Sequence, residues 1–424
     1  MNIRPSTIIK VIILIAIILY VTLTPLNLLG YNLSKVDAFF VLILSLILII
    51  KSRNNLPSLI MFIFISYINY SIVIGEYLVG EYLSAPFTQV KTVDVYGLNI
   101  RILLLFMTIL SLFYKGKKYD LLRDRLITKN SGFIFYLIVF MIVISFLFGI
   151  NRGNLDYYEV RISPLFEYSK LLFLFAYYYS GEIKARKKVI FILLIIFVFQ
   201  DTFYGGRVTS LQLLIFLSIT IFVQKLTFSR VIIASITGII LMGSVGVYRS
   251  TFDLINFSLI DVINNLFNNL LVFDTAIFSY YASATHIAAF NELDFSRRLD
   301  SLINFIISIP LGSNEISSEV THFVRELGYF NMGGGLLPTH FYFWLGWFGV
   351  ILIGFLVVFI INKLKYTNDY QHLLFLGIII NVPRWYLYSP NQLFRGTLFF
   401  ITFLYVGFCI IESMLSKGKN TRYK

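Results

Sequence analysis

Long apolar runs separated by short polar stretches dominate the chain, and most of these runs have the length of a membrane-spanning helix. Within a run the apolar residues are continuous instead of alternating with polar ones, as from Val11 to Tyr20, so the pattern predicts helices and argues against barrel strands. The sequence therefore predicts an all-α polytopic membrane protein with about 12 transmembrane helices. The expected spans lie at about 8–29, 36–50, 57–79, 98–114, 132–150, 164–180, 189–204, 208–223, 231–247, 338–361, 371–388 and 396–415.

One long stretch, 248–337, is neither a span nor a short turn. It divides the chain into a membrane bundle of nine spans in 1–247, a large loop in 248–337, and three spans with a tail in 338–424. Because apolar residues in the loop are regularly interrupted by polar ones, we expect amphipathic helices lying at the membrane interface. A second interpretation, in which 262–290 hides re-entrant or spanning helices, is disfavoured by Asp274 and the nearby asparagines.

Charge predicts the orientation of the spans. An even number of spans puts both termini on one side, and the loops on that side hold 22 of the 35 Lys and Arg residues but only five of the 22 acidic ones. The positive-inside rule therefore places both termini in the cytoplasm and the large loop outside. The net charge of +13 indicates topology and contact with anionic lipid, and nucleic acid is not an expected partner.

Few residues offer metal or cofactor chemistry. The single cysteine, Cys409, excludes a disulfide framework and a zinc site of the Cys/His type. The acidic residues on the outer side are scattered, so no metal and no cofactor are expected, and the chain has no phosphate-binding GxxxxGK[ST] loop.

Arginines are the first candidates for binding a substrate. A guanidinium is always charged and offers a rigid fork of donors that fits phosphate. Arg207 follows Gly205 and Gly206 at the predicted start of a span, where free backbone N–H groups add to the attraction for an anion. The alternative is that each arginine reaches the interface or pairs with an acid, as Arg207 could with Asp201. The residues expected to bind a diphosphate are Arg152, Arg161, Arg207, Arg249 and Arg325.

His340 and Glu326 are the candidate catalytic residues. His340 follows three glycines, 333–335, and opens a span, so it could act as a general base or bind a phosphate. A structural helix-start histidine is the alternative. Glu326 stands beside Arg325 and is either a base or half of a surface ion pair. His286 and His322 are interpreted as ordinary loop residues.

This layout resembles the O-antigen and capsule polymerases of bacteria, the Wzy type, which are related to the O-antigen ligases. About twelve spans, cytoplasmic ends and one large late outer loop carry the resemblance. Two local patterns support it: Gly205-Gly206-Arg207-Val208-Thr209-Ser210-Leu211, and Gly333-Gly334-Gly335-Leu336-Leu337-Pro338-Thr339-His340 followed by Leu345-Gly346-Trp347-Phe348-Gly349. In ligases the segment that closes the large loop carries a histidine, for which His340 is the candidate match.

The resemblance implies a metal-independent glycosyltransferase in the bacterial inner membrane. It would join undecaprenyl-diphosphate-linked oligosaccharide repeat units at the outer face into O-antigen or capsular polysaccharide, with membrane lipid and a chain-length regulator protein as partners. Arginines would hold the leaving diphosphate, and His340 or Glu326 would activate the acceptor hydroxyl.

Two other classes stay open. A flippase for lipid-linked oligosaccharides would have two similar halves and charges lining a central cavity. A membrane O-acyltransferase would have a catalytic pair on the side where its donor enters.

Overall fold

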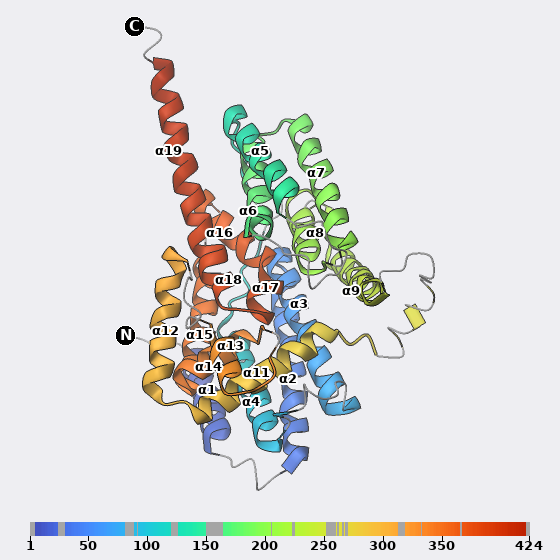
Figure 1. Cartoon of the computed structure of the whole chain (residues 1–424), viewed down its shortest axis with the longest axis vertical. Coiled ribbons are helices and arrows are strands. Elements are labelled where there is room, and N and C mark those ends of the chain that lie inside the picture. Colours follow the sequence, from blue (N-terminus) through green and yellow to red (C-terminus); the bar gives the residue numbers. More distant parts are fainter. Residues whose placement is uncertain are drawn as a thin grey trace. The chain divides into compact units, whose positions relative to one another are not determined.

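The computed structural model describes most of the chain, and every regular element in that part is a helix (Figure 1). The described residues are 5–23, 30–80, 89–90, 92–119, 126–149, 164–204, 206–222, 225–251, 260, 263–264, 267, 270–312, 319–331, 333–364 and 367–420. The prediction of an all-α fold is therefore confirmed for these residues.

Four described helices are long and apolar enough to cross a membrane: 56–79, 94–113, 228–245 and 391–415. The first joins α3 (Leu56–Ile72) to the π-helix η1 (Val73–Val79), and the next two lie in α4 (Val93–Phe113) and α9 (Phe228–Thr251). Further apolar helices are shorter, at 7–23, 132–148, 208–220, 347–363 and 369–380. These helices support a membrane protein, and the count of about 12 spans stays a prediction.

Local sequence explains where several helices begin. Asn55 accepts a hydrogen bond from the Ser58 amide at 3.1 Å and so caps α3. Thr92 does the same for α4, accepting from the Val95 amide at 3.3 Å. Each cap satisfies a backbone donor that the helix itself leaves unpaired, so these polar residues set the ends of otherwise apolar elements.

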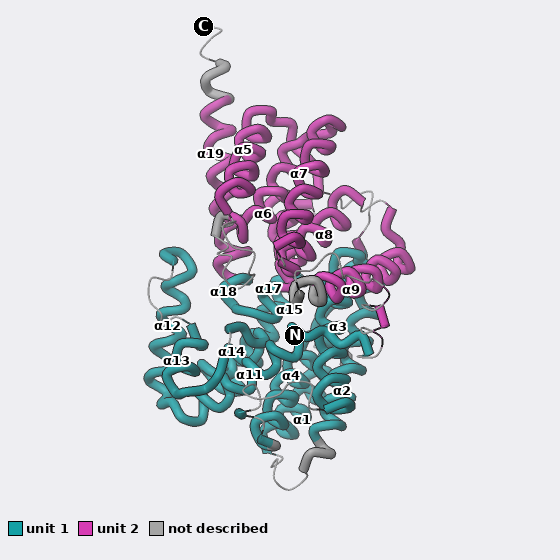
Figure 2. Tube along the Cα trace, turned by 45° about the vertical axis from the view of Figure 1, so that its right-hand side comes forward, with its two compact units in different colours: residues 1–118, 269–363, 384–393 teal, residues 119–268, 364–383, 394–424 magenta. Residues whose placement is uncertain are grey.

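The chain divides into two compact units (Figure 2). The first unit joins 1–118, 269–363 and 384–393, so it collects residues from far apart in the sequence. Besides α3, η1 and α4, it contains α1 (Pro5–Leu23), α2 (Gly30–Ser52), α11 (Asp274–Glu292), α12 (Phe295–Leu311), α13 (Val320–Glu326), α14 (Leu337–Leu345), α15 (Trp347–Lys363) and α18 (Asn391–Leu393).

Helix α4 is the centre of the first unit. It packs against α1, α2, α11, α14 and α15. Every side chain from Ile100 to Leu110 is buried. A helix that is apolar on all sides is expected in such a central position, because no face has to meet water.

The second unit joins 119–268, 364–383 and 394–424. Besides α9, it contains α5 (Gly132–Phe148), α6 (Pro164–Tyr179), α7 (Lys184–Phe203), α8 (Val208–Thr220), α16 (Asp369–Ile380), the π-helix η4 (Phe394–Phe399) and α19 (Phe400–Asn420). Helix α6 packs against α5, α7, α8 and α16. The short helix α17 (Val382–Leu387) includes the boundary between the units.

The expected span at 338–361 is not one helix. It is broken at Gly346, whose φ of +62° ends α14, and α15 packs against α14. A Cβ on Gly349 would lie 2.0 Å from the Phe341 carbonyl oxygen, so only glycine allows this close approach. The continuous apolar sequence suggested a single helix because hydropathy does not register a break in the helix.

The segment predicted as an outer loop contains two different kinds of helix. Helix α12 is amphipathic as expected: Ser301 and Ser308 are buried, whereas Ile303, Ile306 and Ile307 are about half exposed. Helix α11 departs from that expectation, because 13 of its 19 residues are buried. Its many alanines and serines let neighbouring helices approach closely, which favours burial over an interfacial position.

Candidate functional site

A loop of three glycines, 333–335, leads into α14 in the first unit. All three have positive φ, at 97°, 90° and 140°, a conformation that strains residues with a side chain. The Gly335 amide donates to the Leu387 carbonyl at 3.1 Å, and the Leu336 amide donates to the Ser283 hydroxyl at 2.8 Å. These bonds fix the loop between α11 and the end of α17.

His340 lies in the first turns of α14, with 5% of its surface exposed. Its Nδ1 atom lies 3.1 Å from the carbonyl oxygen of Leu336, the N-cap residue of the same helix. A carbonyl can only accept, so Nδ1 carries the proton in the neutral ring. The lone pair is therefore on Nε2, which makes no hydrogen bond with a described residue. This is the tautomer in which Nε2 can accept a proton.

His286 lies directly against His340, with the ring centroids 4.5 Å apart and the rings inclined at 68°. It is fully buried, and neither ring nitrogen has a hydrogen-bond partner among the described residues. Burial, together with the neighbouring His340, lowers the pKa of His286 well below its ordinary value, so its ring is neutral. Of the two imidazoles, only His340 retains exposed surface. The ring of His286 is fully buried and packs against it.

The imidazole rings of His286 and His340 both lie directly against Gly335 of the glycine loop. A Cβ at this position would lie 2.4 Å from Cε1 of His286 and 3.0 Å from Cε1 of His340. The rings of His286 and His340 therefore fill the space that a side chain at position 335 would occupy. Any residue larger than glycine must displace one of the rings.

Replacing Gly335 with alanine should therefore destabilise the protein more than replacing Gly333, by about 1–3 kcal/mol in the free energy of unfolding. Both positions have positive φ, but a Cβ on Gly333 meets nothing within 4 Å, so Gly333→Ala reports backbone strain alone. Denaturation of the purified variants in detergent measures the difference. Equal losses at the two positions would contradict the packing described here.

Arg325 and Glu326, at the end of α13, have different surroundings. The Arg325 Nε donates to the Asn331 carbonyl at 3.0 Å, and the Asn331 carboxamide oxygen accepts from the Gly333 amide at 2.7 Å. Arg325 is therefore connected to the glycine loop. Glu326 instead forms an ion pair with Arg297 at 2.9 Å, in which both side chains are about half exposed. Among the described residues, hydrogen bonds thus connect Arg325 to the glycine loop before His340, whereas Glu326 pairs with Arg297.

Arg207 belongs to the second unit and is the N-cap residue of α8. The turn before it is held by Asp201, whose Oδ2 accepts from the amide and the hydroxyl of Ser210, both at 2.8 Å. A Cβ on Gly206 would lie 2.2 Å from Oδ1 of Asp201, so this glycine is required for the turn. A helix begins after Arg207 as predicted, and Asp201 rather than Arg207 caps it.

The remaining predicted arginines cannot be placed. Arg152 and Arg161 lie outside the described residues, and the side chain of Arg249, near the end of α9, is likewise outside them. Their expected contact with a diphosphate stays a prediction. Among the described residues, no group of three or more His, Cys, Asp or Glu side chains could hold a metal ion.

Three ionisable side chains inside apolar helices, Glu76, Asp37 and Lys170, were missed by the sequence analysis. Glu76, in η1, is buried and accepts hydrogen bonds from the Tyr281 hydroxyl at 3.1 Å on both carboxylate oxygens. Asp37 and Arg101 form a fully buried ion pair at 3.2 Å between α2 and α4. In the second unit the Lys170 ammonium donates to the Gln212 side chain at 3.0 Å. An ionisable residue within an apolar span is itself the indication that could have identified them.

Comparison of the chain with protein-family models, with curated proteins and with solved structures gives no match.

Proposed function

We propose that the protein is a polymerase that joins lipid-linked oligosaccharide repeat units at the outer face of a bacterial inner membrane. Its donor and acceptor would both be oligosaccharides attached to undecaprenyl diphosphate, and its product an O-antigen or capsular polysaccharide. The observation that carries the proposal is His340: a neutral, Nδ1-protonated imidazole behind a glycine loop, with Nε2 unbonded among the described residues.

The proposed reaction uses His340 as a general base. Nε2 takes the proton of an acceptor sugar hydroxyl while the hydroxyl oxygen attacks the anomeric carbon of the donor. The bond from that carbon to the diphosphate oxygen breaks, and undecaprenyl diphosphate leaves with the bonding electrons. Charge that develops on the leaving group would be stabilised by arginine. Arg325 is linked to the glycine loop through Asn331, and Arg207 remains the second candidate from the sequence.

The function is tested by deleting the gene and separating the surface polysaccharide on a gel. A polymerase predicts that the ladder of chain lengths collapses to single repeat units, and that the intact gene restores it. A chain-length regulator would then alter the distribution of lengths without being required for linkage. Loss of the single units themselves from the surface would contradict the proposal.

Orientation gives a separate prediction. Both termini are proposed to be cytoplasmic because basic residues concentrate on that side. In a protein lacking Cys409, a cysteine replacing the exposed Glu319 should react with an impermeant maleimide in intact cells. A cysteine replacing the exposed Lys118 should react only after the inner membrane is opened. The reverse labelling would put the proposed site on the wrong side of the membrane.

Buried charges favour one second candidate, a flippase for the same lipid-linked oligosaccharides. Glu76 and the Asp37–Arg101 pair lie in apolar helices, where ionisable groups commonly mark a transport pathway. The deletion experiment separates the two functions, because a flippase is required for single units to reach the surface and a polymerase is not.

A further inference from the structure

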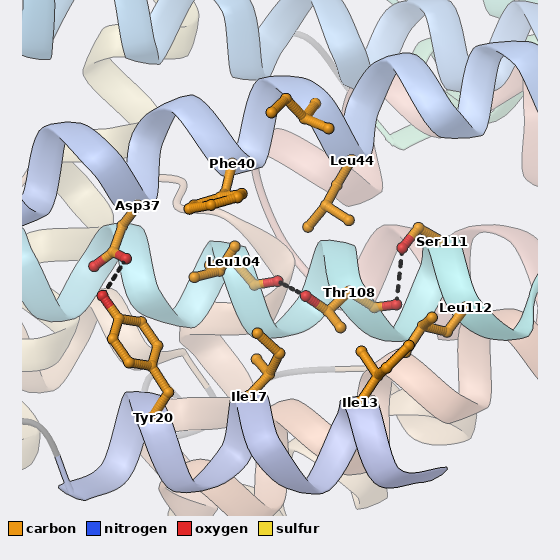
Figure 3. A pocket seen from close by; sticks show the side chains of 11 residues that line it. Ile13, Ile17, Tyr20, Asp37, Phe40, Leu44, Leu104, Thr108, Ser111 and Leu112 are labelled. Atoms are coloured by element: carbon orange, nitrogen blue, oxygen red, sulfur yellow. Dashed lines mark hydrogen bonds between the residues drawn. The ribbon is translucent and has the colours of Figure 1, made fainter. Parts of the chain in front are cut away.

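A cavity of about 300 Å³ lies between α1, α2 and α4 in the first unit (Figure 3). Its walls are mainly aliphatic side chains, with Ile13 and Ile17 from α1, Phe40 and Leu44 from α2, and Leu104 from α4. Ile13 and Phe40 are about half exposed, so the cavity is open at its side between α1 and α2. An apolar cavity of about half this volume stays dry and binds small hydrocarbons, so this one has room for part of a hydrocarbon chain.

The polar groups along the cavity are already bonded within the protein. The Thr108 hydroxyl donates to the Leu104 carbonyl at 2.8 Å, and the Ser111 hydroxyl donates to the Thr108 carbonyl at 3.0 Å (Figure 3). At the other end Asp37 accepts from the Tyr20 hydroxyl at 2.7 Å and pairs with Arg101. A polar ligand would find few groups to bind along these walls, whereas a hydrocarbon chain leaves every one of these bonds intact.

The end of the cavity at Ser111 carries positive charge. The Lys51 ammonium donates to the Ser111 carbonyl, which places it at that end. Lys51 lies seven residues after Leu44, so it continues the cavity face of α2 by two turns. Lys10 lies three residues before Ile13 and likewise continues the cavity face of α1. Because Tyr20 of α1 bonds Asp37 of α2 at the opposite end, Lys10 and Lys51 both lie toward the Ser111 end of the cavity.

We propose that this cavity and the two lysines together form a binding site for an anionic phospholipid. One acyl chain occupies the cavity between α1 and α2, and the phosphate lies between Lys10 and Lys51 at the membrane surface. An anion there is attracted by both ammonium groups, and the acyl chain fills a space that water would enter at a cost. At the far end of the cavity the charges of Asp37 and Arg101 neutralise each other. A second headgroup would therefore meet no net positive charge there.

The site differs from the proposed catalytic one in what it recognises. The proposed glycosyl transfer needs a base beside the acceptor hydroxyl, and none of the residues lining the cavity is a histidine. The occupant is therefore a resident lipid that supports α1 against α4, and its chain needs no particular headgroup beyond a negative charge.

The headgroup is tested with photoactivatable phospholipids whose acyl chain carries a diazirine. The purified full chain should crosslink phosphatidylglycerol about tenfold more than phosphatidylcholine with the same chain, and peptides from α1, α2 or α4 should carry the label. Replacing Lys10 and Lys51 together with glutamine should reduce phosphatidylglycerol labelling to the phosphatidylcholine level. The matched control replaces Lys184 and Lys188, two exposed lysines of α7, and should change nothing. Equal labelling by the two lipids, or equal loss in both variants, would overturn the proposal.

The position of the acyl chain is tested by filling the cavity with a larger side chain. Leu44→Trp should block labelling of these peptides, whereas Leu46→Trp, on an exposed face of the same helix, should leave it unchanged. In the unaltered protein, an excess of unlabelled phosphatidylglycerol should compete and phosphatidylcholine should not, which gives a readout independent of folding of the variants. Labelling confined to other helices, or unaffected by phosphatidylglycerol, would also overturn the proposal.

Discussion

Replacing His340 with alanine should reduce the rate of polymerisation by about 10²- to 10⁴-fold and leave only single repeat units on the gel. The acceptor hydroxyl would then have no base at Nε2, while its binding and that of the diphosphate would be unchanged. The rate is measured with the purified protein and lipid-linked repeat units, alongside the ladder from cells of the deletion strain. The amount of protein in the membrane is measured in parallel, since lost protein would also remove the ladder.

A glutamine at position 340 separates catalysis from structure. Its carboxamide can still donate to the Leu336 carbonyl, as Nδ1 of His340 does, but it cannot take a proton at neutral pH. We expect His340→Gln to accumulate normally and remain inactive. His322→Ala on α13 is the control histidine, and Glu326→Gln should keep activity because Glu326 sits in an exposed ion pair with Arg297. If the His340→Gln protein were active, His340 would be excluded as the general base.

Replacing Arg207 with alanine should also abolish the ladder, and Arg207→Lys should fail to restore it. A guanidinium can hold two oxygens of the departing diphosphate at once, whereas an ammonium is a single point of charge. Loss of one contact that strengthens as charge develops costs about 3 kcal/mol, or about a hundredfold in rate. The rate and the gel ladder are measured as for His340. Arg230→Ala, at the exposed start of α9 in the same unit, is the matched control.

The lysine variant is the decisive one for Arg207. An ordinary ion pair between Arg207 and Asp201 would be kept by lysine, and activity would return. Asp201→Ala is a poor probe, because Asp201 caps α8 through Ser210 and its loss should cost about 0.5–2 kcal/mol of stability whatever Arg207 does. Normal ladders from Arg207→Lys would reduce its role to charge alone.

The sequence predicted individual helices well where local residues mark their ends. The helix expected at 208–223 corresponds to α8 (Val208–Thr220), because two glycines directly before Arg207 in the sequence favour a helix start there. The span expected at 164–180 corresponds to α6 (Pro164–Tyr179), where Pro164 is suited to a first helical position. Apolar helices with such boundaries can be predicted without knowledge of their tertiary contacts.

The site was predicted less completely for a physical reason. His340 was identified from the glycines before it, but its partner His286 comes 54 residues earlier and meets it only because α11 is buried beneath the loop. No local pattern reports such a contact. Glu76 is different: it stood in an apolar run where ionisable groups are costly, and that information was in the sequence.

The space left by Gly335 also limits how this protein can change over evolutionary time. Because the two imidazoles of His286 and His340 occupy that space, the three positions are not free to drift separately. Under the proposed function residue 340 stays a histidine, so an alanine at 335, which its positive φ already strains, would fit only in a lineage where residue 286 has first become smaller. Substitutions here should therefore appear in a fixed order, with the supporting imidazole lost before the glycine.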